Sequence, residues 1–217
     1  MKSLVLQIKL KSDTTFGRGD GVAGLVDVEV EHDRYGMPFL RGRTLKGLLV
    51  EECANILYSL DSGSQKWHKE AQFLFGSPGS SLKDDGEMFV GDACLPEDLS
   101  DVIKQAVKNE TFTSLEILES LTAIRRQTAM SVKGAPVKGS LRSMRVVLRE
   151  TFFEAKLTFQ KPPKDRDQAL LAACVASLQR VGTGRNRGRG RVEVCLLEND
   201  KDITNNCLDI FAREITE

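Results

Sequence analysis

The sequence predicts an α+β fold in one domain, with strands and helices in the order βαββαβ. Two patterns carry this prediction. Apolar and polar residues alternate at residues 4–11 and 146–160, which is typical of strands, and apolar residues at helical spacing follow each. With 217 residues, 41% of them hydrophobic, the chain is long enough for one sizeable core. No apolar run is long enough to cross a membrane and the start has no signal-peptide pattern, so we expect a cytoplasmic protein.

The first half of the chain contains three helical patterns and up to three short strands. A possible helix cap, Thr44, precedes an apolar stripe at helical spacing, and Gly36 and Gly76 mark breaks. The expected elements are a strand at 4–11, an irregular Gly-rich segment at 16–24, a short strand at 26–30, a turn at 33–38, a helix from Thr44 to residue 60, a short helix at 67–75, a strand at 87–94 and a short helix at 98–107.

In the second half, residues 125–145 have little periodicity and predict an extended hairpin or loop. One long strand at 146–160 is expected to place Phe153, Ala155, Leu157 and Phe159 on one face. A helix at 165–181, a loop and a strand at 191–197 follow, and the last twenty residues are loosely patterned. This order matches the ferredoxin-like (RRM-like) βαββαβ core, which RNA-binding proteins often use.

Charge is segregated along the chain, although the net charge is zero. Residues 121–149 contain seven Lys or Arg and no acid, and residues 180–191 contain five Arg and no acid. Residues 84–119 contain ten acids opposed by Lys104 and Lys108. This distribution suits a polyanion on one surface and protein partners on another.

Two segments have the composition of phosphate-binding sites. Residues 182–190, GTGRNRGRG, lie between a predicted helix and a predicted strand, and glycines let a backbone approach a ligand closely. This order is the reverse of a dinucleotide-binding fingerprint, and the loop has no Gly-Lys-Ser/Thr, so both nucleotide-binding motifs are excluded. Residues 39–47, FLRGRTLKG, place Arg41, Arg43 and Lys46 around a helix N-terminus, where anions are favoured. We expect one phosphate track made of both segments.

These two segments resemble one family. Residues 36–47, GMPFLRGRTLKG, are similar to the pattern G-x-P-x-I-P-G-S-S-L-K-G, and residues 182–190 are similar to the glycine-rich loop of the RAMP superfamily of CRISPR proteins. The resemblance is greatest to the backbone subunit of type III effector complexes and extends to Leu197. Arg41 replaces the proline of the pattern, and Arg43 and Thr44 replace two serines.

The resemblance implies a single RAMP domain whose copies stack along the guide part of a crRNA. Each copy would have a ferredoxin-like palm at 1–15, 40–60 and 146–197, a lid and catalytic loop at 16–38, an insertion at 61–120, a thumb hairpin at 121–145 and a tail at 198–217. The thumb would wedge into the guide–target duplex at regular intervals. The expected RNA contacts are Arg18, Arg41, Arg43, Thr44, Lys46, Arg125, Arg126, Lys133, Lys138, Gly182, Gly184, Arg185, Arg187, Gly188 and Arg189.

The resemblance also implies a catalytic aspartate. The pattern small-Ile-Asp, followed by Asp-x-x-x-Gly-x-Pro, aligns with residues 24–27 and 33–38 and places Asp27 at the cutting position. A single carboxylate holds a hydrated divalent metal, for which Mg²⁺ is expected, or orients the ribose 2′-OH of the target. Asp13, Asp20 and Asp33 are the nearby carboxylates that could share the metal.

Three functions remain open from the residues. The first is an RNA-guided endoribonuclease active in the assembled complex, the second a crRNA scaffold that does not cut, and the third a metal-independent crRNA-processing enzyme. The third would use a histidine, but regular strand alternation would point His32 away from Asp27, and His68 is expected at the surface. Expected partners are crRNA, target RNA, further RAMP copies, a large polymerase-like subunit, a small subunit and a subunit that caps the guide handle, with no membrane.

Overall fold

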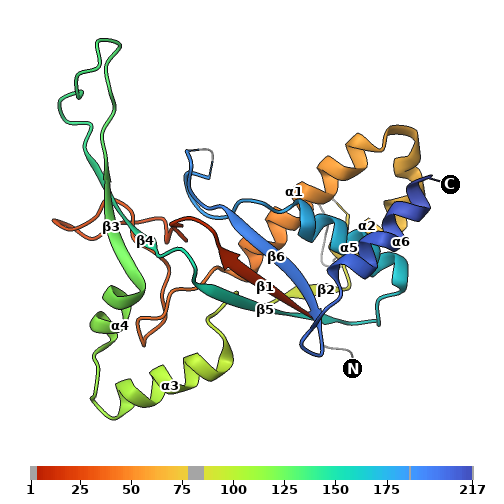
Figure 1. Ribbon diagram of the computed structural model, residues 1–217, viewed down its shortest axis with the longest axis horizontal. Coiled ribbons are helices and arrows are strands. Elements are labelled where there is room, and N and C mark those ends of the chain that lie inside the picture. The colour runs from red at the N-terminus through yellow and green to blue at the C-terminus, as the bar shows by residue number, and fades with distance from the viewer. Residues whose placement is uncertain (1–3, 78–85, 186, 217) are drawn as a thin grey trace.

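The computed structural model describes residues 4–77, 86–185 and 187–216, and it shows a mixed α+β fold with an antiparallel sheet (Figure 1). The main sheet has five strands in the order β2-β5-β1-β6-β7, and β3 and β4 form a separate antiparallel hairpin. The strands are β1 Leu4–Leu10, β2 Met88–Val90, β3 Thr122–Gln127, β4 Arg142–Val147, β5 Phe152–Phe159, β6 Val192–Glu198 and β7 Lys201–Asp202.

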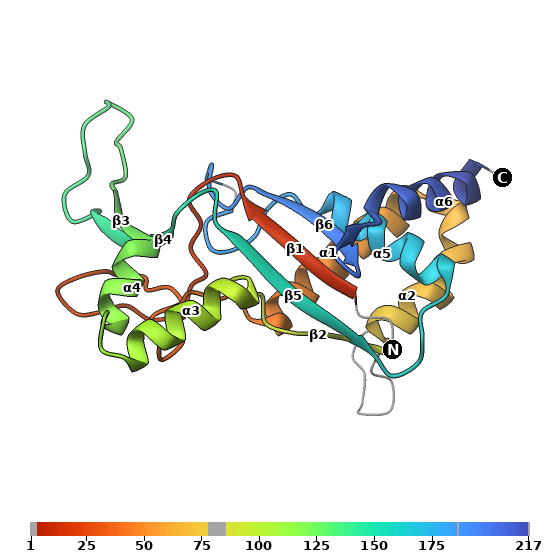
Figure 2. The ribbon, with the colours of Figure 1, turned by 60° about the horizontal axis from the view of Figure 1, so that its bottom comes forward.

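The alternation in the sequence corresponds to the two faces of the main sheet. Leu4, Leu6, Ile8 and Leu10 of β1 are fully buried, whereas the residues between them are partly exposed. The same alternation buries residues 153, 155, 157 and 159 of β5, as expected. β1 lies between β5 and β6, so its buried side chains form the centre of the core (Figure 2).

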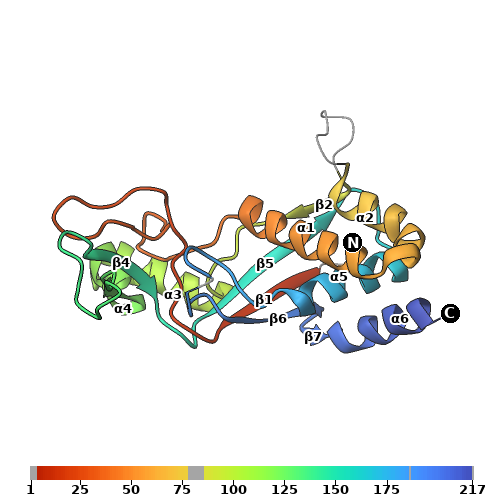
Figure 3. The same cartoon turned by 90° about the horizontal axis from the view of Figure 1, so that it is seen from above.

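The helices fall into a group beside the main sheet and a pair beside the hairpin (Figure 3). Helix α5 is buried from Asp167 to Val175, because it packs against α1, α2 and α6 as well as β6. From Ala169 to Val175 the helix is apolar on all sides, which is typical of a helix in the interior. The helices are α1 Gly42–Ser59, α2 His68–Phe75, α3 Glu97–Lys108, α4 Ser114–Leu121, α5 Asp165–Ser177 and α6 Thr204–Thr216, with a 3₁₀ segment, η1, at Asp61–Trp67.

Helix α1 begins two residues before the expected cap. The Gly42 amide donates to Asp92 Oδ1 at 2.7 Å, so a carboxylate fifty residues away caps the helix. A Cβ on Gly42 would lie 2.2 Å from the Val90 carbonyl oxygen, so only glycine fits there. The prediction that Thr44 is the cap was therefore wrong, and Thr44 lies exposed in the first turn.

Several predicted strands and helices have different bounds. The expected strand at 146–160 is two strands, because Glu150 has φ +68° between β4, which pairs with β3, and β5, which pairs with β1. The expected strand at 26–30 forms only isolated bridges, among them Val28 with Met144. The strand at 87–94 shortens to β2, and the helix at 165–181 ends at Ser177.

Two helices were not predicted. Helix α4 has a capping box in which the Glu116 amide donates to Thr113 Oγ1 at 3.2 Å and the Thr113 amide donates to Glu116 at 2.7 Å. Helix α6 lies in the segment expected to be a loosely patterned tail. Its Phe211 packs on Trp67 with ring centroids 4.7 Å apart, so the end of the chain belongs to the helical group.

The β3–β4 hairpin projects from the end of the molecule that is far from α6 (Figures 1 and 2). Its strands cover residues 122–127 and 142–147, and residues 128–141 connect them. In the part of the chain that the structure describes, no helix is long and apolar enough to cross a membrane.

Candidate nucleic-acid interface

The glycine–arginine loop, residues 182–190, contains glycines of two kinds. Gly182, Gly184, Gly188 and Gly190 all have φ between +73° and +80°. A Cβ on Gly182 would lie 2.5 Å from the Thr15 carbonyl oxygen, and one on Gly190 would lie 2.1 Å from the Val181 carbonyl oxygen. A Cβ on Gly184 or Gly188 would meet nothing within 4 Å. Gly182 and Gly190 therefore allow the loop to pack closely against the fold, and Gly184 and Gly188 leave backbone open to a ligand.

The two basic segments meet in one pocket. Arg41 and Thr44 line a pocket of about 200 Å³ together with Gly182, Thr183 and Arg185. The Thr183 amide donates to the Thr15 carbonyl at 2.8 Å and fixes the loop at this edge. The structure therefore brings the Arg41–Thr44 segment and the glycine–arginine loop together, as the sequence predicted.

Several of the expected RNA-binding side chains have protein partners. Arg41 makes two hydrogen bonds to Glu31, at 2.7 and 3.0 Å, and Arg185 makes two to Glu51, at 2.9 and 3.0 Å. The Arg185–Glu51 pair is partly exposed, and pairs of this kind contribute about 0–1 kcal/mol, so a phosphate could replace Glu51 at little cost. Glu31 is only 13% exposed, so its bidentate pair with Arg41 would cost more to break. Lys46 Nζ donates to the Met88 carbonyl oxygen at 3.0 Å, which directs it away from the pocket.

One of the free amides expected at the start of α1 is not free, because the Gly42 amide already donates to Asp92. Arg43 and Thr44 remain exposed on the first turn. An anion at this segment would therefore have to be held by side chains as well as by the helix N-terminus.

The second half of the loop lies against the hairpin. Arg187 lines a pocket of about 530 Å³ with Gln127 and Arg142, and Arg189 contacts Met144. Gly188 and Arg189 also line a pocket of about 700 Å³ that contains Arg125. The loop thus runs from the start of α1 to the base of the hairpin.

Three other residues expected to contact RNA do not line any of the three pockets described above. Arg18 binds Asp20 through Nε at 2.6 Å. Lys133 and Lys138 are exposed in the connection 128–141, which projects beyond the sheet.

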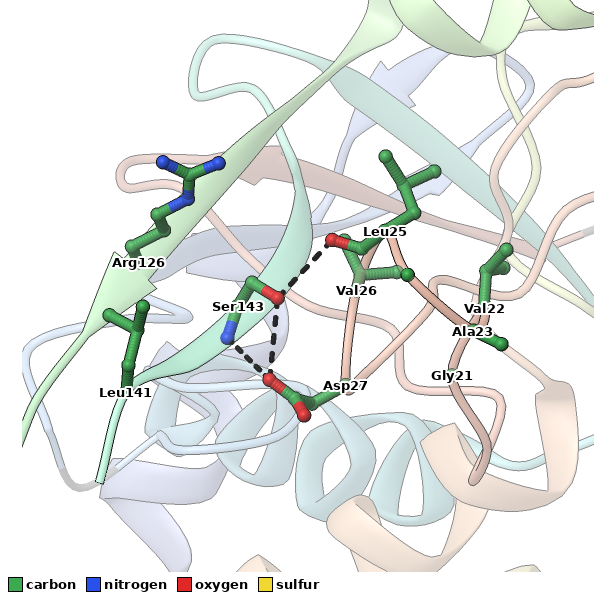
Figure 4. A pocket seen from close by; sticks show the side chains of 10 residues that line it. Gly21, Val22, Ala23, Leu25, Val26, Asp27, Arg126, Leu141 and Ser143 are labelled. Carbon is green, nitrogen blue, oxygen red and sulfur yellow. Dashed lines mark hydrogen bonds between the residues drawn. The ribbon is translucent and has the colours of Figure 1, made fainter. Parts of the chain in front are cut away.

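Asp27 lies in a separate pocket of about 650 Å³, formed by residues 21–27 together with Arg126, Leu141 and Ser143. Its Oδ2 accepts from the Ser143 amide at 2.6 Å and from Ser143 Oγ at 3.3 Å (Figure 4). Its own amide donates to the Ser143 carbonyl oxygen at 2.9 Å. One residue of β4 therefore fixes both the backbone and the carboxylate of Asp27.

The hydrogen bond from the Ser143 amide lowers the pKa of Asp27, and the Ser143 hydroxyl and the charge of Arg142 lower it further. The carboxylate therefore stays ionised at neutral pH. A carboxylate with a lowered pKa is a weak proton acceptor, so this environment suits charge–charge or metal contacts better than general base catalysis.

The other candidate carboxylates have their own partners. Asp13 binds Arg125 at 2.8 Å, Asp20 binds Arg18, and Asp33 accepts from the Tyr35 and Met37 amides at 2.9 and 3.0 Å. Among the described residues, no three His, Cys, Asp or Glu side chains gather around one point. A single carboxylate such as Asp27 is enough for a hydrated Mg²⁺, which keeps most of its waters and binds through one or two carboxylates. The described residues around Asp27 do not form a dedicated metal cage.

Sequence reasoning missed three residues of this region. Ser143 carried no signal, because its role depends on a partner 116 residues away. Arg142 belongs to the acid-free stretch that indicated RNA contacts, but it was not singled out. Arg145 of the same stretch is buried, and its Nε binds Glu29 Oε1 at 2.8 Å with both side chains at most 5% exposed.

His32 does not lie on a regular strand, so the alternation argument that pointed it away from Asp27 has no basis in the structure. Its Nδ1 lies 3.0 Å from the Asp33 carbonyl oxygen, within the turn at 33–38.

Together, the fold and the site define an α+β protein whose basic loop lines pockets with the start of α1 and with the hairpin, and whose Asp27 carboxylate is fixed in a separate pocket. A sequence profile of the RAMP superfamily matches residues 7–193. The chain therefore belongs to the RAMP superfamily.

Solved structures show the same fold. A chain of the Type III-B Cmr-beta complex in its apo state has a TM-score of 0.61 at 14% identity, covering 92% of this chain and 98% of the other. A chain of Type III-B Cmr-beta bound to cognate target RNA has a TM-score of 0.61 at 12% identity, with coverages of 95% and 98%. No curated protein sequence matches this chain.

Proposed function

We propose that this chain is the crRNA-binding backbone subunit of a type III CRISPR effector complex, and that it cleaves complementary target RNA at regular intervals in a metal-dependent reaction. The observation that carries the proposal is the pocket shared by the Arg41–Thr44 segment and the glycine–arginine loop. Clustered arginines next to open glycine backbone suit the phosphates of a guide strand. Membership of the RAMP superfamily and the likeness to Cmr-beta chains support it.

The arrangement of elements supports the palm and thumb of the expected domain. The order β1-α1-β2-β5-α5-β6, with β1 between β5 and β6, supports a ferredoxin-like palm. The projecting β3–β4 hairpin has the position and charge of a thumb. We take the partners to be crRNA, target RNA and the other subunits of such a complex, acting in the cytoplasm.

Asp27 is the proposed cutting residue. Ser143 holds its Oδ2 in place, and the lowered pKa keeps the carboxylate charged. A divalent metal, Mg²⁺, would bind the carboxylate and offset negative charge on the target phosphate. The wide pocket around residues 21–27 leaves room for a nucleotide beside Asp27.

Replacing Asp27 by alanine in the assembled complex tests this function. We expect the complex to hold its guide and bind a complementary RNA but to lose the regularly spaced cuts, measured by gel analysis of end-labelled target. Asp20→Ala is the companion variant, because the exposed Asp20 carboxylate binds Arg18 among the described residues. Unchanged cutting by this variant would show that Asp27 acts without Asp20, and lost cutting would show that the two carboxylates act together.

Unchanged cutting by the Asp27→Ala complex would contradict the catalytic assignment. A wild-type complex that holds crRNA but never cuts would support a scaffold that does not cleave. Cleavage of precursor crRNA without metal by the chain alone would support a processing enzyme, and replacing His32 and His68 would then show whether a histidine acts.

A further inference from the structure

We propose that Glu51 is an internal substitute for an RNA phosphate, which holds Arg185 in the free chain and releases it when RNA binds. Glu51 lies on α1 and Arg185 in the glycine–arginine loop, 134 residues further along the chain. Arg185 Nη2 donates to both carboxylate oxygens of Glu51, at 2.9 and 3.0 Å. Arginine donors bind carboxylate and phosphate oxygens alike, so the two anions compete for the same group. This step rests on the proposed function, because it assumes that Arg185 contacts RNA.

The Glu51 carboxylate has a single partner. Among the residues that the structure describes, Glu51 forms side-chain hydrogen bonds and an ion pair with Arg185 alone. Its side chain is 50% exposed, so it does not pack in the core. A surface ion pair of this kind contributes little to folding. The main effect of Glu51 is therefore on the availability of Arg185.

Other pocket-lining arginines have carboxylate partners that are tied more firmly to the fold. Glu31, which pairs with Arg41, is only 13% exposed. Asp13, which pairs with Arg125, also accepts from a backbone amide in the turn between β4 and β5, at 3.3 Å. These carboxylates have a structural role as well as a charge. Glu51 has neither their burial nor a second contact, so it is the one that RNA displaces most easily.

The position of Arg185 does not depend on Glu51. Arg180 Nη1 donates to the Arg185 carbonyl oxygen at 2.7 Å, and the Thr183 amide donates to the Thr15 carbonyl oxygen at 2.8 Å. These two contacts fix the loop backbone on either side of Gly184. Removing the carboxylate should therefore leave Arg185 beside the pocket at the start of α1, with its guanidinium released.

The pair lowers the affinity of the free chain for RNA in two ways. A phosphate that binds Arg185 must first displace Glu51, and the displaced carboxylate then remains as an uncompensated negative charge near the strand. A strand that also contacts Arg187 and Arg189 overcomes this competition, because contacts along one strand raise the effective concentration of the next phosphate. Glu51 thus makes Arg185 available to a strand held along the loop and not to any isolated phosphate.

Glu51→Gln and Glu52→Gln form a matched pair of variants. Both remove one negative charge at neighbouring positions of α1, and Glu52 has no ion pair among the described residues. The affinity of the chain for fluorescein-labelled oligouridine would be measured by fluorescence anisotropy at low salt. We expect Glu51→Gln to raise the affinity about two- to five-fold, the equivalent of one exposed ion pair, and Glu52→Gln to change it much less. The melting temperatures of both variants should stay close to that of the wild type.

A second measurement repeats Glu51→Gln in an Arg185→Ala chain. No guanidinium is left to release there, so the added substitution should bring no gain in affinity. Equal gains from the two glutamine variants, a loss of affinity or a marked loss of thermal stability in Glu51→Gln, or a gain that persists without Arg185 would each overturn the role of Glu51. RNA binding by the wild type would still leave the proposed function standing. A wild-type chain that does not bind RNA would overturn the proposed function, and the role of Glu51 with it.

Discussion

At the scale of single residues, the pair of Glu29 and Arg145 explains why the segment around residue 29 stays against the hairpin. Arg145 Nε binds Glu29 Oε1 at 2.8 Å, and its Nη1 donates to Thr122 Oγ1 at 3.3 Å. The Thr15 hydroxyl donates to the Arg145 carbonyl oxygen at 3.0 Å. The pair joins β4, the start of β3 and the segment before α1 at one buried point.

Removing one member of this pair should destabilise the protein strongly. Glu29→Ala leaves the Arg145 guanidinium buried without its counter-charge, which typically costs about 3–5 kcal/mol. We expect chemical denaturation followed by circular dichroism to show a loss of this size. The double variant Glu29→Leu with Arg145→Met buries no charge and should be much closer to wild type, so a double variant as unstable as the single one would contradict this explanation.

At the scale of elements, the glycines of the glycine–arginine loop differ in whether they have a role in folding. Gly184 and Gly190 have the same φ of +73°, but only Gly190 faces backbone at close range. Any side chain at either position adopts a left-handed conformation, at a cost of about 1–2 kcal/mol. Only at Gly190 does a collision with Val181 add to that cost.

Gly190→Ala should therefore lower the melting temperature clearly more than Gly184→Ala. The Val181 carbonyl oxygen would lie 2.1 Å from the new Cβ, and because it is backbone it cannot rotate away. Thermal unfolding of the two variants measures the difference. Equal melting temperatures would show that the loop moves freely and that the close contact has no energetic weight.

At the scale of the whole molecule, a neutral net charge coexists with a basic surface. Arg185, Arg187 and Arg189 follow one another along the loop, from the pocket with Thr44 to the pocket with Arg125. Because these side chains lie in three different pockets, they suit contact with an extended polyanion better than with a single phosphate group.

Replacing all three arginines with alanine should weaken RNA binding and reduce its salt dependence. Each phosphate contact on single-stranded RNA contributes about 0.7 to the slope of log affinity against log salt, so three contacts contribute about 2. Binding isotherms from about 50 to 200 mM salt measure this slope. An unchanged affinity at low salt would show that the loop does not bind RNA.

The sequence predicted the features that depend on residues close together in the chain. The alternation of Leu4 to Leu10 identified β1, and the composition of residues 39–47 and 182–190 identified two segments that share a pocket. The cap of α1 by Asp92, the break at Glu150 and the contacts of Ser143 with Asp27 depend on distant partners or on backbone conformation. No local pattern encodes these features, so they required the structure.

The position of Trp67 decides what an optical experiment on this protein can detect. It is the single tryptophan of the chain, it is 1% exposed, and Phe211 and Arg166 pack on its ring. It is the last residue of η1, directly before α2, and α2 lies at the end of the molecule opposite the hairpin (Figure 1). Its intrinsic fluorescence will therefore report the undocking of α6 and global unfolding. It should change little when RNA is added, because the basic loop and the hairpin lie far from it.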